Sequence, residues 1–311
     1  MRVIENETIL GVFNDLEAID AMRDALVAQA RGECDTPMPM HLAILPEDAE
    51  IHIKSSYRIG GGYFAVKVAS GFPKNLERGL SVGNGMMLLS SAETGEPLAF
   101  LADGGYLTDA RTAAVSALMT RELGRRDTVL GVVGTGIQAR LQARLHAAVL
   151  DLRKVVVWGR TASRVDAYVE DMRAILPDVE VIPVASPASV AEHASLLVTV
   201  TAARTPLLAA ADIRPGTHIS AVGSDSPGKQ ELESSILEKC DLLLVDSRDQ
   251  CTRLGELQHA AHVAGRAVEA GAFCDEPQLQ DESAVTVCDF TGLGVEDLYI
   301  ASYVYDKVVN A

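Results

Sequence analysis

Several kinds of segment are missing from this sequence, and each absence excludes a class of protein. No run of about 18 apolar residues occurs, so the sequence predicts no membrane-spanning helix. The segment from Met1 to Leu16 is polar and lacks the apolar stretch of a secretory signal, so we expect a cytoplasmic protein. The cysteines number 5 and form no CxxC pair, which favours reduced thiols over a disulfide framework.

Basic residues are scarce relative to acidic ones. The 27 Lys and Arg residues stand against 43 Asp and Glu, which gives a formal net charge of −16. A surface of this charge repels a phosphate backbone, so nucleic acid is not an expected partner. A local pocket of Arg and Lys could still hold a small anion. At 311 residues and 48% hydrophobic content, the chain is long enough for two domains.

The apolar pattern changes along the chain. A helix is expected over residues 16–31, with Asn14 as its N-cap, and a second over residues 109–123, ended by Gly124. Between them, short apolar segments alternate with Gly, Pro and polar residues, as in a strand-rich region. The expected strands there are residues 51–53, 63–68, 86–89 and 98–101.

After Arg126, compact apolar runs alternate with helical stretches, and a last helix is expected over residues 295–309. The runs are residues 129–133, 155–158, 181–184, 196–200, 219–222 and 242–245. Such alternation predicts an α/β fold with a Rossmann-type, doubly wound parallel sheet. We place this dinucleotide-binding domain at residues 126–289, inserted in a strand-rich α+β domain of residues 1–125 and 290–311. The return of the last helix to the first domain is inferred mainly from the resemblance described below.

The sharpest local signal is the segment GVVGTGIQA at residues 131–139. It places Gly134, Gly136 and Ala139 in a GxGxxA pattern after an expected strand and before an amphipathic helix. The first glycine permits a tight turn, the second lets a pyrophosphate approach the backbone, and the alanine allows close helix–strand packing. The helix N-terminus then offers N–H groups to the anion. We expect a nicotinamide dinucleotide to bind here.

The end of the next expected strand bears on the type of dinucleotide. An NAD site usually has an acidic residue there for the ribose hydroxyls, whereas this chain reads Gly159-Arg160-Thr161. Arg160 and Thr161 could hold a 2′-phosphate, which favours NADP(H) over NAD(H). If Arg160 only stacks on adenine or faces solvent, NAD(H) remains acceptable.

Four further segments carry a resemblance to a known family. They are VKVASGFPKN at residues 66–75, LTDARTAA at 107–114, AVGSDSPGKQEL at 221–232 and DFTGLGVEDL at 289–298. Together with GTGIQA they resemble the ornithine cyclodeaminase and mu-crystallin superfamily, which includes alanine dehydrogenases and ketimine reductases. The motifs stand in the order of the family and span nearly the whole chain.

The resemblance implies roles for individual residues. Lys67 matches the active-site lysine, Arg111 the arginine that binds the substrate carboxylate, and Asp225 the catalytic aspartate. It also implies a homodimer built through the N-terminal domain. The residues expected to bind the cofactor are Thr112, Gly134, Gly136, Ile137, Gln138, Ala139, Arg160, Thr161, Thr199, Thr201 and Gly223.

The chemistry of these residues favours hydride transfer at the α-carbon of a small amino or imino acid. A guanidinium fork suits a carboxylate, and a partly desolvated carboxylate such as Asp225 can manage protons on nitrogen or water. Taken singly, each residue also fits an ordinary structural position, and only their joint occurrence favours catalysis. Lys54, in a strand where cyclodeaminases generally carry a glutamate, suits a second substrate carboxylate better than the side-chain amine of ornithine.

Three functions follow from this pattern. The first is an NAD(P)-dependent oxidoreductase, either an imine reductase or an amino-acid dehydrogenase. The second is a redox-neutral cyclodeaminase that forms a cyclic imino acid with loss of ammonia. The third is an NADPH- and small-ligand-binding protein of mu-crystallin type. His259 and His262 lack a third ligand at metal-site spacing, so no metal is expected.

Overall fold

The computed structural model describes residues 1–278 and 281–310, and the chain divides into two compact units. The first comprises Met1–Arg111 and Leu293–Ala311, and the second comprises Thr112–Gly292. The division falls inside helix α3 (Tyr106–Glu122), whereas the sequence placed the first boundary after this helix. No helix of the described chain is both long and apolar enough to cross a membrane.

The first unit is built on a largely antiparallel sheet with the strand order β1-β7-β6-β5-β4-β2, and β3 pairs with β4. Strand β1 runs parallel to β7, and the other pairs are antiparallel. The strands are β1 (Arg2–Glu5), β2 (Cys34–Asp35), β3 (Met40–Ile44), β4 (Ala49–Arg58), β5 (Tyr63–Gly71), β6 (Gly83–Ser91) and β7 (Pro97–Ala102). The sequence located β4 to β7 but gave no strand at β1, β2 or β3.

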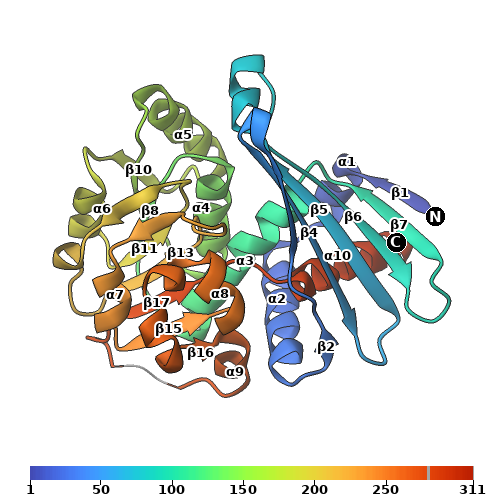
Figure 1. Cartoon of the computed structure of the whole chain (residues 1–311). Coiled ribbons are helices and arrows are strands. Elements are labelled where there is room, and N and C mark those ends of the chain that lie inside the picture. The colour runs from blue at the N-terminus through green and yellow to red at the C-terminus, as the bar shows by residue number, and fades with distance from the viewer. Residues whose placement is uncertain (279–280, 311) are drawn as a thin grey trace. The chain divides into compact units, whose positions relative to one another are not determined.

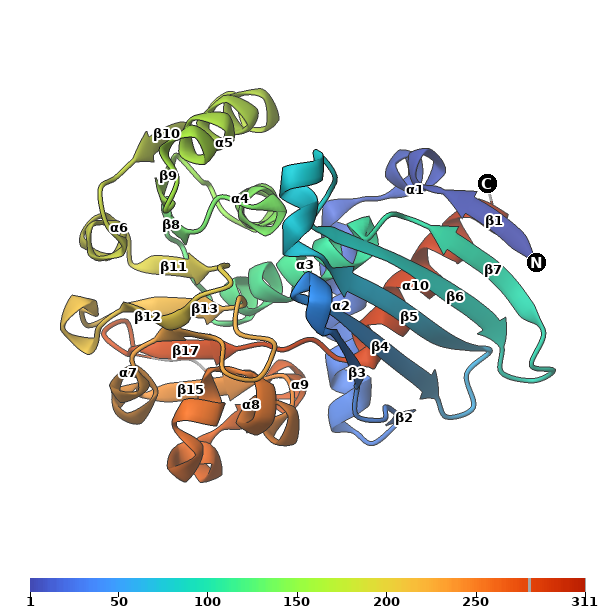
Figure 2. The same ribbon diagram turned by 45° about the horizontal axis from the view of Figure 1, so that its top comes forward.

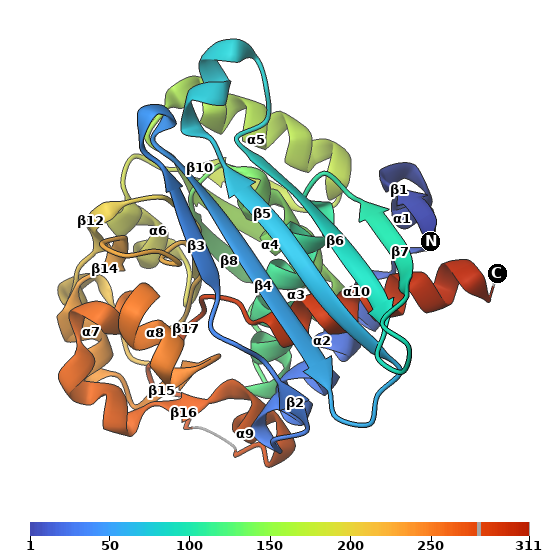
Figure 3. The same ribbon diagram turned by 45° about the vertical axis from the view of Figure 1, so that its right-hand side comes forward.

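Two helices cover one face of this sheet. They are α2 (Asp15–Ala30) and α10 (Gly294–Val309), which pack on each other, and α10 also packs on β4 and β5. Figure 3 shows both helices running behind the sheet. The short helix α1 (Asn6–Val12) precedes α2. Helix α10 can approach so closely because residue 294 is glycine: an added Cβ there would lie 2.3 Å from the carbonyl oxygen of Ser55 on β4.

The N-terminus of α2 is determined by a single residue in the sequence, the N-cap Asn14. The side-chain oxygen of Asn14 accepts hydrogen bonds from the backbone N–H groups of Leu16 and Glu17, at 3.0 and 3.2 Å. These N–H groups have no partner within the helix, so the cap satisfies them. The apolar face of α2, which includes Ile19, Met22 and Leu26, is buried. The predicted cap is confirmed.

The second unit contains a sheet of eight parallel strands in the order β10-β9-β8-β11-β13-β17-β15-β16. Its strands are β8 (Val129–Val133), β9 (Lys154–Trp158), β10 (Glu180–Pro183), β11 (Leu196–Thr199), β13 (His218–Ala221), β15 (Leu242–Val245), β16 (Val268–Glu269) and β17 (Thr286–Asp289). A separate pair consists of β12 (Arg204–Leu208) and β14 (Gln230–Leu232). The predicted α/β class and doubly wound sheet are confirmed, although β12, β14, β16 and β17 were not predicted.

Helices cover both faces of the parallel sheet, as Figures 1 and 2 show. They include α4 (Ile137–Val149), α5 (Ala162–Ile175), α6 (Pro187–His193), α7 (Ser234–Lys239), α8 (Arg248–Leu254) and α9 (Ala270–Asp275). The chain runs from β8 outward to β10 and then returns to β11 on the other side of β8. In sheets of this kind, ligands bind beyond the carboxyl ends of the strands at such a reversal.

Candidate functional site

The loop after β8 has the backbone of a dinucleotide-binding turn. Gly134 has a φ of +132°, a value that side-chain-bearing residues rarely adopt. An added Cβ would also lie 2.9 Å from Val200, so this position excludes every other residue without a shift of the neighbouring loop. The backbone N–H of Gly134 donates to the carbonyl oxygen of Trp158 at 2.8 Å, which fixes the loop to the end of β9.

Gly136 is the N-cap of α4, and no side chain caps this helix. The N-terminus of a helix offers N–H groups to an anion, and the helix dipole favours negative charge there. Gly136 has an ordinary φ, and an added Cβ would meet nothing within 4 Å. The chain itself does not require a glycine here, whereas a phosphate lying against the backbone would. Ala139 is fully buried, as close helix–strand packing demands.

Arg140, in the second unit, hydrogen-bonds to the backbone of the loop after β8. Its guanidinium donates to the carbonyl oxygens of Thr135 and Gly136, at 2.7 and 3.0 Å. It also pairs with Asp171 at 2.6 Å and lies over the ring of Tyr168. These contacts attach the turn after β8 to helix α5.

The ends of the next two strands lie beside this loop, because β8, β11 and β13 are neighbours and parallel. Thr199 ends β11, Thr201 follows it, and Gly223 follows β13. The carboxylate of Glu231 joins the two loops: it accepts from the N–H of Thr201 at 2.6 Å and from that of Gly223 at 2.9 Å. Burial raises the pKa of Glu231 to about 7 despite these hydrogen bonds.

Sequence reasoning did not single out Glu231, although it lies in the quoted segment at residues 221–232. It also explains Gly223, where an added Cβ would lie 2.3 Å from the carbonyl oxygen of Thr201 and 2.5 Å from the Glu231 carboxylate. Two more buried carboxyls extend this set of carboxylate–backbone hydrogen bonds. Glu256 accepts from the N–H of Glu231 at 2.7 Å, and Asp289 accepts from the N–H of Glu256 at 2.9 Å.

The other expected cofactor residues lie in the same unit. Arg160 and Thr161 follow β9 and are exposed, and Thr161 is the N-cap of α5 without a side-chain cap hydrogen bond. Ile137 is 60% exposed at the start of α4, and Gln138 beside it is half-buried. Thr112 follows Arg111 in α3 and is half-buried. Asp225 lies in the loop between β13 and β14, where Lys229 pairs with its carboxylate at 2.6 Å.

The first unit contains a buried cluster of opposite charges. Lys67 on β5 reaches Asp297 on α10 with an Nζ–Oδ2 distance of 3.0 Å. Arg111 contacts Glu296 at 2.8 Å and Asp297 at 3.2 Å. These four residues are all nearly inaccessible to solvent. Lys54, also buried, lies directly opposite Lys67 in the β4–β5 register.

The electrostatics of this cluster are strongly perturbed. Burial, opposed in part by Asp297, lowers the pKa of Lys67 to about 7. Although its own burial acts in the other direction, the pKa of Asp297 is lowered by Lys67 and Arg111. A third carboxyl, Asp103, accepts from the N–H of Leu107 at the start of α3, and burial raises its pKa. Titratable groups shifted in this way are typical of binding and catalytic sites.

Glu296 and Asp297 were missed as site residues, although the segment DFTGLGVEDL had been noted. The signal that could have found them is the pair of adjacent acids in the first turn of a helix whose next turns are largely apolar. Within the first unit the structure brings together Lys54, Lys67 and Arg111 with these two acids. Within the second unit it places the glycine loop, the threonines after β11 and the segment with Gly223 and Asp225 along neighbouring strand ends.

A glycine-rich loop, an uncapped helix and a strand reversal together define a dinucleotide-binding protein of the doubly wound class. The chain belongs to the ornithine cyclodeaminase/mu-crystallin family, whose model matches residues 3–311. It is 35% identical over 306 residues to an uncharacterised cyclodeaminase of Sinorhizobium fredii, covering 94% of this chain and 91% of that protein.

Two solved structures share the fold over the whole chain. One is Δ1-pyrroline-2-carboxylate reductase of Thermococcus litoralis in complex with NADH and L-proline, with a TM-score of 0.93 and 26% identity. The comparison covers 100% of this chain and 98% of that one. The other is iminosuccinate reductase of Paracoccus denitrificans in complex with NAD+, with a TM-score of 0.86, 27% identity and coverage of 100% and 97%.

Proposed function

We propose that this protein is an NAD(P)-dependent oxidoreductase that acts at the α C–N bond of a small, anionic amino or imino acid. The observation that carries the proposal is the buried cluster of Lys54, Lys67 and Arg111 within the first unit. Burying three cations is unfavourable unless anions accompany them. Glu296 and Asp297 accompany them within the first unit, and a guanidinium and two ammonium groups held in this way can also bind a substrate carboxylate.

The cofactor fits the residues of the second unit. Gly136 leaves open space beside an uncapped helix N-terminus, and Gly134 makes the turn that leads to it. Around these, Thr112, Ile137, Gln138, Ala139, Thr199, Thr201 and Gly223 would complete the binding surface. When bound, the nicotinamide supplies or accepts a hydride.

The residues of the chain would then bind and orient the substrate. We assign carboxylate binding to Arg111 and Lys54, and to Lys67 a position beside the reacting centre, where its ammonium can hold or polarise a substrate oxygen or nitrogen. Asp297 and Glu296 would orient Arg111 and Lys67 rather than react. To Asp225, in the second unit, we assign proton transfer, as the family resemblance implies, and its carboxylate, with about 43% side-chain exposure, is accessible for that role.

For the type of cofactor, we propose NADP(H) over NAD(H). Support comes from Arg160 and Thr161, which follow β9 without an acidic residue and remain exposed. A guanidinium can bind a 2′-phosphate through paired hydrogen bonds. Replacing Arg160 by Glu should reverse the preference, measured as the ratio of NADPH to NADH affinities, and an unchanged ratio would exclude this role.

We also propose that the first unit mediates a homodimer. The face of its sheet opposite Lys67 carries Ile53, Val68 and Met86 in cross-strand register, and Met86 is 43% exposed. Contiguous apolar side chains on an uncovered sheet face are typical of an interface. Light scattering of the wild-type protein and of Val68→Lys, which should be monomeric, tests this proposal.

A panel of substrates tests the reaction itself. Purified protein is mixed with NADPH, and separately with NADH, together with 2-oxo acids and ammonia or methylamine, and the absorbance of the reduced nicotinamide is followed. The reverse panel uses NADP+ or NAD+ with small amino acids, including ornithine, and ammonia is assayed in every well. Net change of reduced cofactor, abolished in Asp225→Ala, is the expected result.

The second candidate function is a redox-neutral cyclodeaminase, which the 35% identity to the Sinorhizobium protein favours. It would release ammonia with a catalytic amount of cofactor and no net change in absorbance. Cofactor and small-ligand binding without turnover in either panel would instead indicate a binding protein.

A further inference from the structure

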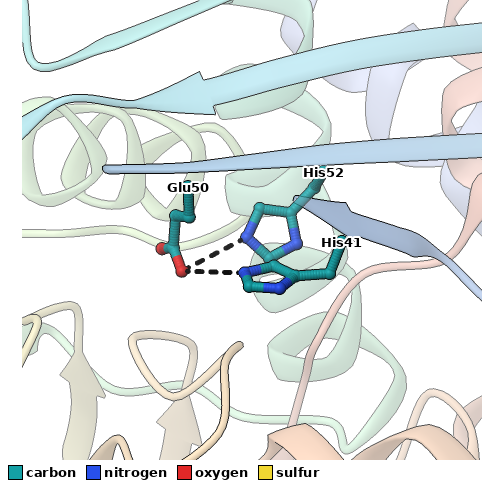
Figure 4. A group of neighbouring side chains, drawn as sticks. All are labelled: His41, Glu50 and His52. Carbon is teal, nitrogen blue, oxygen red and sulfur yellow. Dashed lines mark ion pairs between the residues drawn. The ribbon is translucent and has the colours of Figure 1, made fainter. Parts of the chain in front are cut away.

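A second group of side chains in the first unit has the composition of a metal site. His41 lies on β3 and directly opposite His52 on β4, in the antiparallel register of the two strands. Glu50 precedes His52 by two residues, and side chains two apart on a strand share a face. Figure 4 shows both imidazole rings turned toward one carboxylate oxygen of Glu50. We propose that His41, Glu50 and His52 bind a divalent transition-metal ion, Zn²⁺ in the first instance.

The distances between the ligand atoms suit one ion. Oε2 of Glu50 lies 3.5 Å from Nε2 of His41 and 3.6 Å from Nε2 of His52. Both distances exceed the roughly 2.7–3.2 Å of an N–H···O hydrogen bond. They are close to the separation of about 3.3 Å between neighbouring ligands of a tetrahedral zinc ion with bonds of about 2.0–2.1 Å. All three atoms lie within 4.8 Å of one another, so an ion needs only small side-chain adjustments.

The lack of a hydrogen-bond partner for Nε2 of His52 in the described part of the chain also supports metal binding. This nitrogen is buried. Buried polar atoms in folded proteins almost always have a partner, and a metal bond would provide one. Two imidazoles and one carboxylate form the ligand set of several zinc enzymes, in which the fourth position stays open. Imidazole ligands favour zinc and its neighbours over Mg²⁺ or Ca²⁺.

The open position would take an anionic oxygen. Zn²⁺ with one carboxylate ligand keeps a positive charge, which favours an anion as the fourth ligand. Lys54 follows His52 by two residues on the same face of β4, about 7 Å along the strand. It is buried and lies opposite Lys67. We therefore assign the fourth position to the second carboxylate of a dicarboxylic substrate. This last assignment rests on the proposed function, whereas binding of the ion does not.

The site is not evident from the spacing of the residues along the chain. His41 and His52 are separated by a turn, and only the pairing of β3 with β4 brings their rings to 4.9 Å between centroids. The histidines that are close in the chain are instead His259 and His262, for which no metal is expected. Among the described residues, no other group of three or more His, Cys, Asp or Glu side chains has its ligand atoms this close.

Metal binding is tested with full-length protein freed of metal by a chelator. Co²⁺ is titrated first, because tetrahedral Co²⁺ has a visible absorption band, and Zn²⁺ is then used to displace it. One ion per chain is expected. His52→Asn and Glu50→Gln should each weaken binding by at least about 100-fold, since even the loss of an outer partner of a metal ligand costs 10–100-fold. The matched control is His262→Asn, because His262 is exposed and pairs with Glu238 in the second unit.

Circular dichroism and the thermal midpoint without metal show whether the variants fold. Saturating Zn²⁺ should raise the midpoint of the wild type by about 5 °C and leave that of His52→Asn unchanged. If the wild type gives no tetrahedral Co²⁺ band, or if His262→Asn weakens binding as much as His52→Asn, the site is refuted. If Co²⁺ and Zn²⁺ bind equally well to Glu50→Gln, the carboxylate is not a ligand and the proposal is equally wrong.

The fourth ligand is tested on the Co²⁺ form without any turnover. Succinate should shift the visible band, and acetate at the same concentration should shift it less, because only succinate can also reach Lys54. An unchanged band would refute the assignment of the fourth position while leaving the three-residue site in place. Failure of the proposed reaction would appear separately, as an absence of turnover in the substrate panels.

Discussion

Replacement of Asp297 by Asn removes the carboxylate shared by Lys67 and Arg111. Asp297 contacts these cations at 3.0 and 3.2 Å, and all three side chains are buried. Arg111 keeps its contact with Glu296 at 2.8 Å and cannot lose its proton. Lys67 can respond differently, because its pKa is already lowered to about 7 and its ammonium can become neutral.

The expected loss of stability therefore depends on pH. Weakening of the Arg111 contact should cost about 2 kcal/mol at any pH, as for a hydrogen bond to a charged group. Suppose that the substitution lowers the pKa of Lys67 by about two pH units. The resulting loss in the free energy of unfolding is then complete below the new pKa, where Lys67 is charged in both proteins, and vanishes above the wild-type pKa of about 7, where Lys67 is neutral in both. That adds about 2 kcal/mol at pH 5.5 and almost nothing at pH 8.5. We expect losses of about 4 and about 2 kcal/mol, respectively.

Urea unfolding followed by circular dichroism at pH 5.5 and 8.5 measures both values. The single tryptophan, Trp158, lies in the second unit, so its fluorescence shows whether that unit unfolds separately. The control is Glu33→Gln, because Glu33 pairs with Arg58 at 3.2 Å on the surface of the first unit and should contribute less than about 1 kcal/mol at either pH. Equal losses for Asp297→Asn at the two pH values would refute the argument about Lys67.

Three other results are expected. Gly136→Val should weaken NADPH binding at least about tenfold with little change in the thermal midpoint, because the added side chain meets open space in the protein and obstructs only a phosphate. The control is Gly265→Val, whose side chain also meets open space and which should bind NADPH normally. Equal NADPH binding by the two variants would contradict the assigned loop. Asn14→Ala should lower the free energy of unfolding by about 1 kcal/mol through loss of the α2 cap, measured in urea, and an unchanged value would mean that water replaces the cap. In the wild type kcat/KM should fall as pH rises through about 7, because the charged form of Lys67 is lost, whereas Lys67→Arg should lose this decline; its persistence would assign the titration to another group.

Most of the second unit could be predicted from the sequence because its signals are local. Strand β8, the turn at Gly134 and the start of α4 all lie within one stretch of fewer than twenty residues, and their geometry follows from residue type. The predicted bounds of β8 and β15 agree with the structure. Strand β17 was missed because half of it is the polar pair Thr286 and Asp289, both buried in the centre of the sheet.

The first unit was harder to predict, because its order comes from pairings across the chain. Strand β1 joins the sheet only through β7, about a hundred residues later, and β3 has exposed side chains with no alternation to mark it. Sequence patterns report which residues prefer to be buried. They do not report which strand lies beside which when the connections are long.

The sequence by itself determined the class of fold and the nucleotide loop, because both depend on short segments with a fixed spacing, and it offered Lys67, Arg111 and Asp225 as candidates through the family resemblance of their segments. Only the tertiary structure decided what surrounds those candidates. Glu296 and Asp297 reach Lys67 and Arg111 from the far end of the chain, and their effect on pKa requires burial, which no local pattern encodes. The pairing of His41 with His52 is of the same kind, since it exists only where two antiparallel strands come into register.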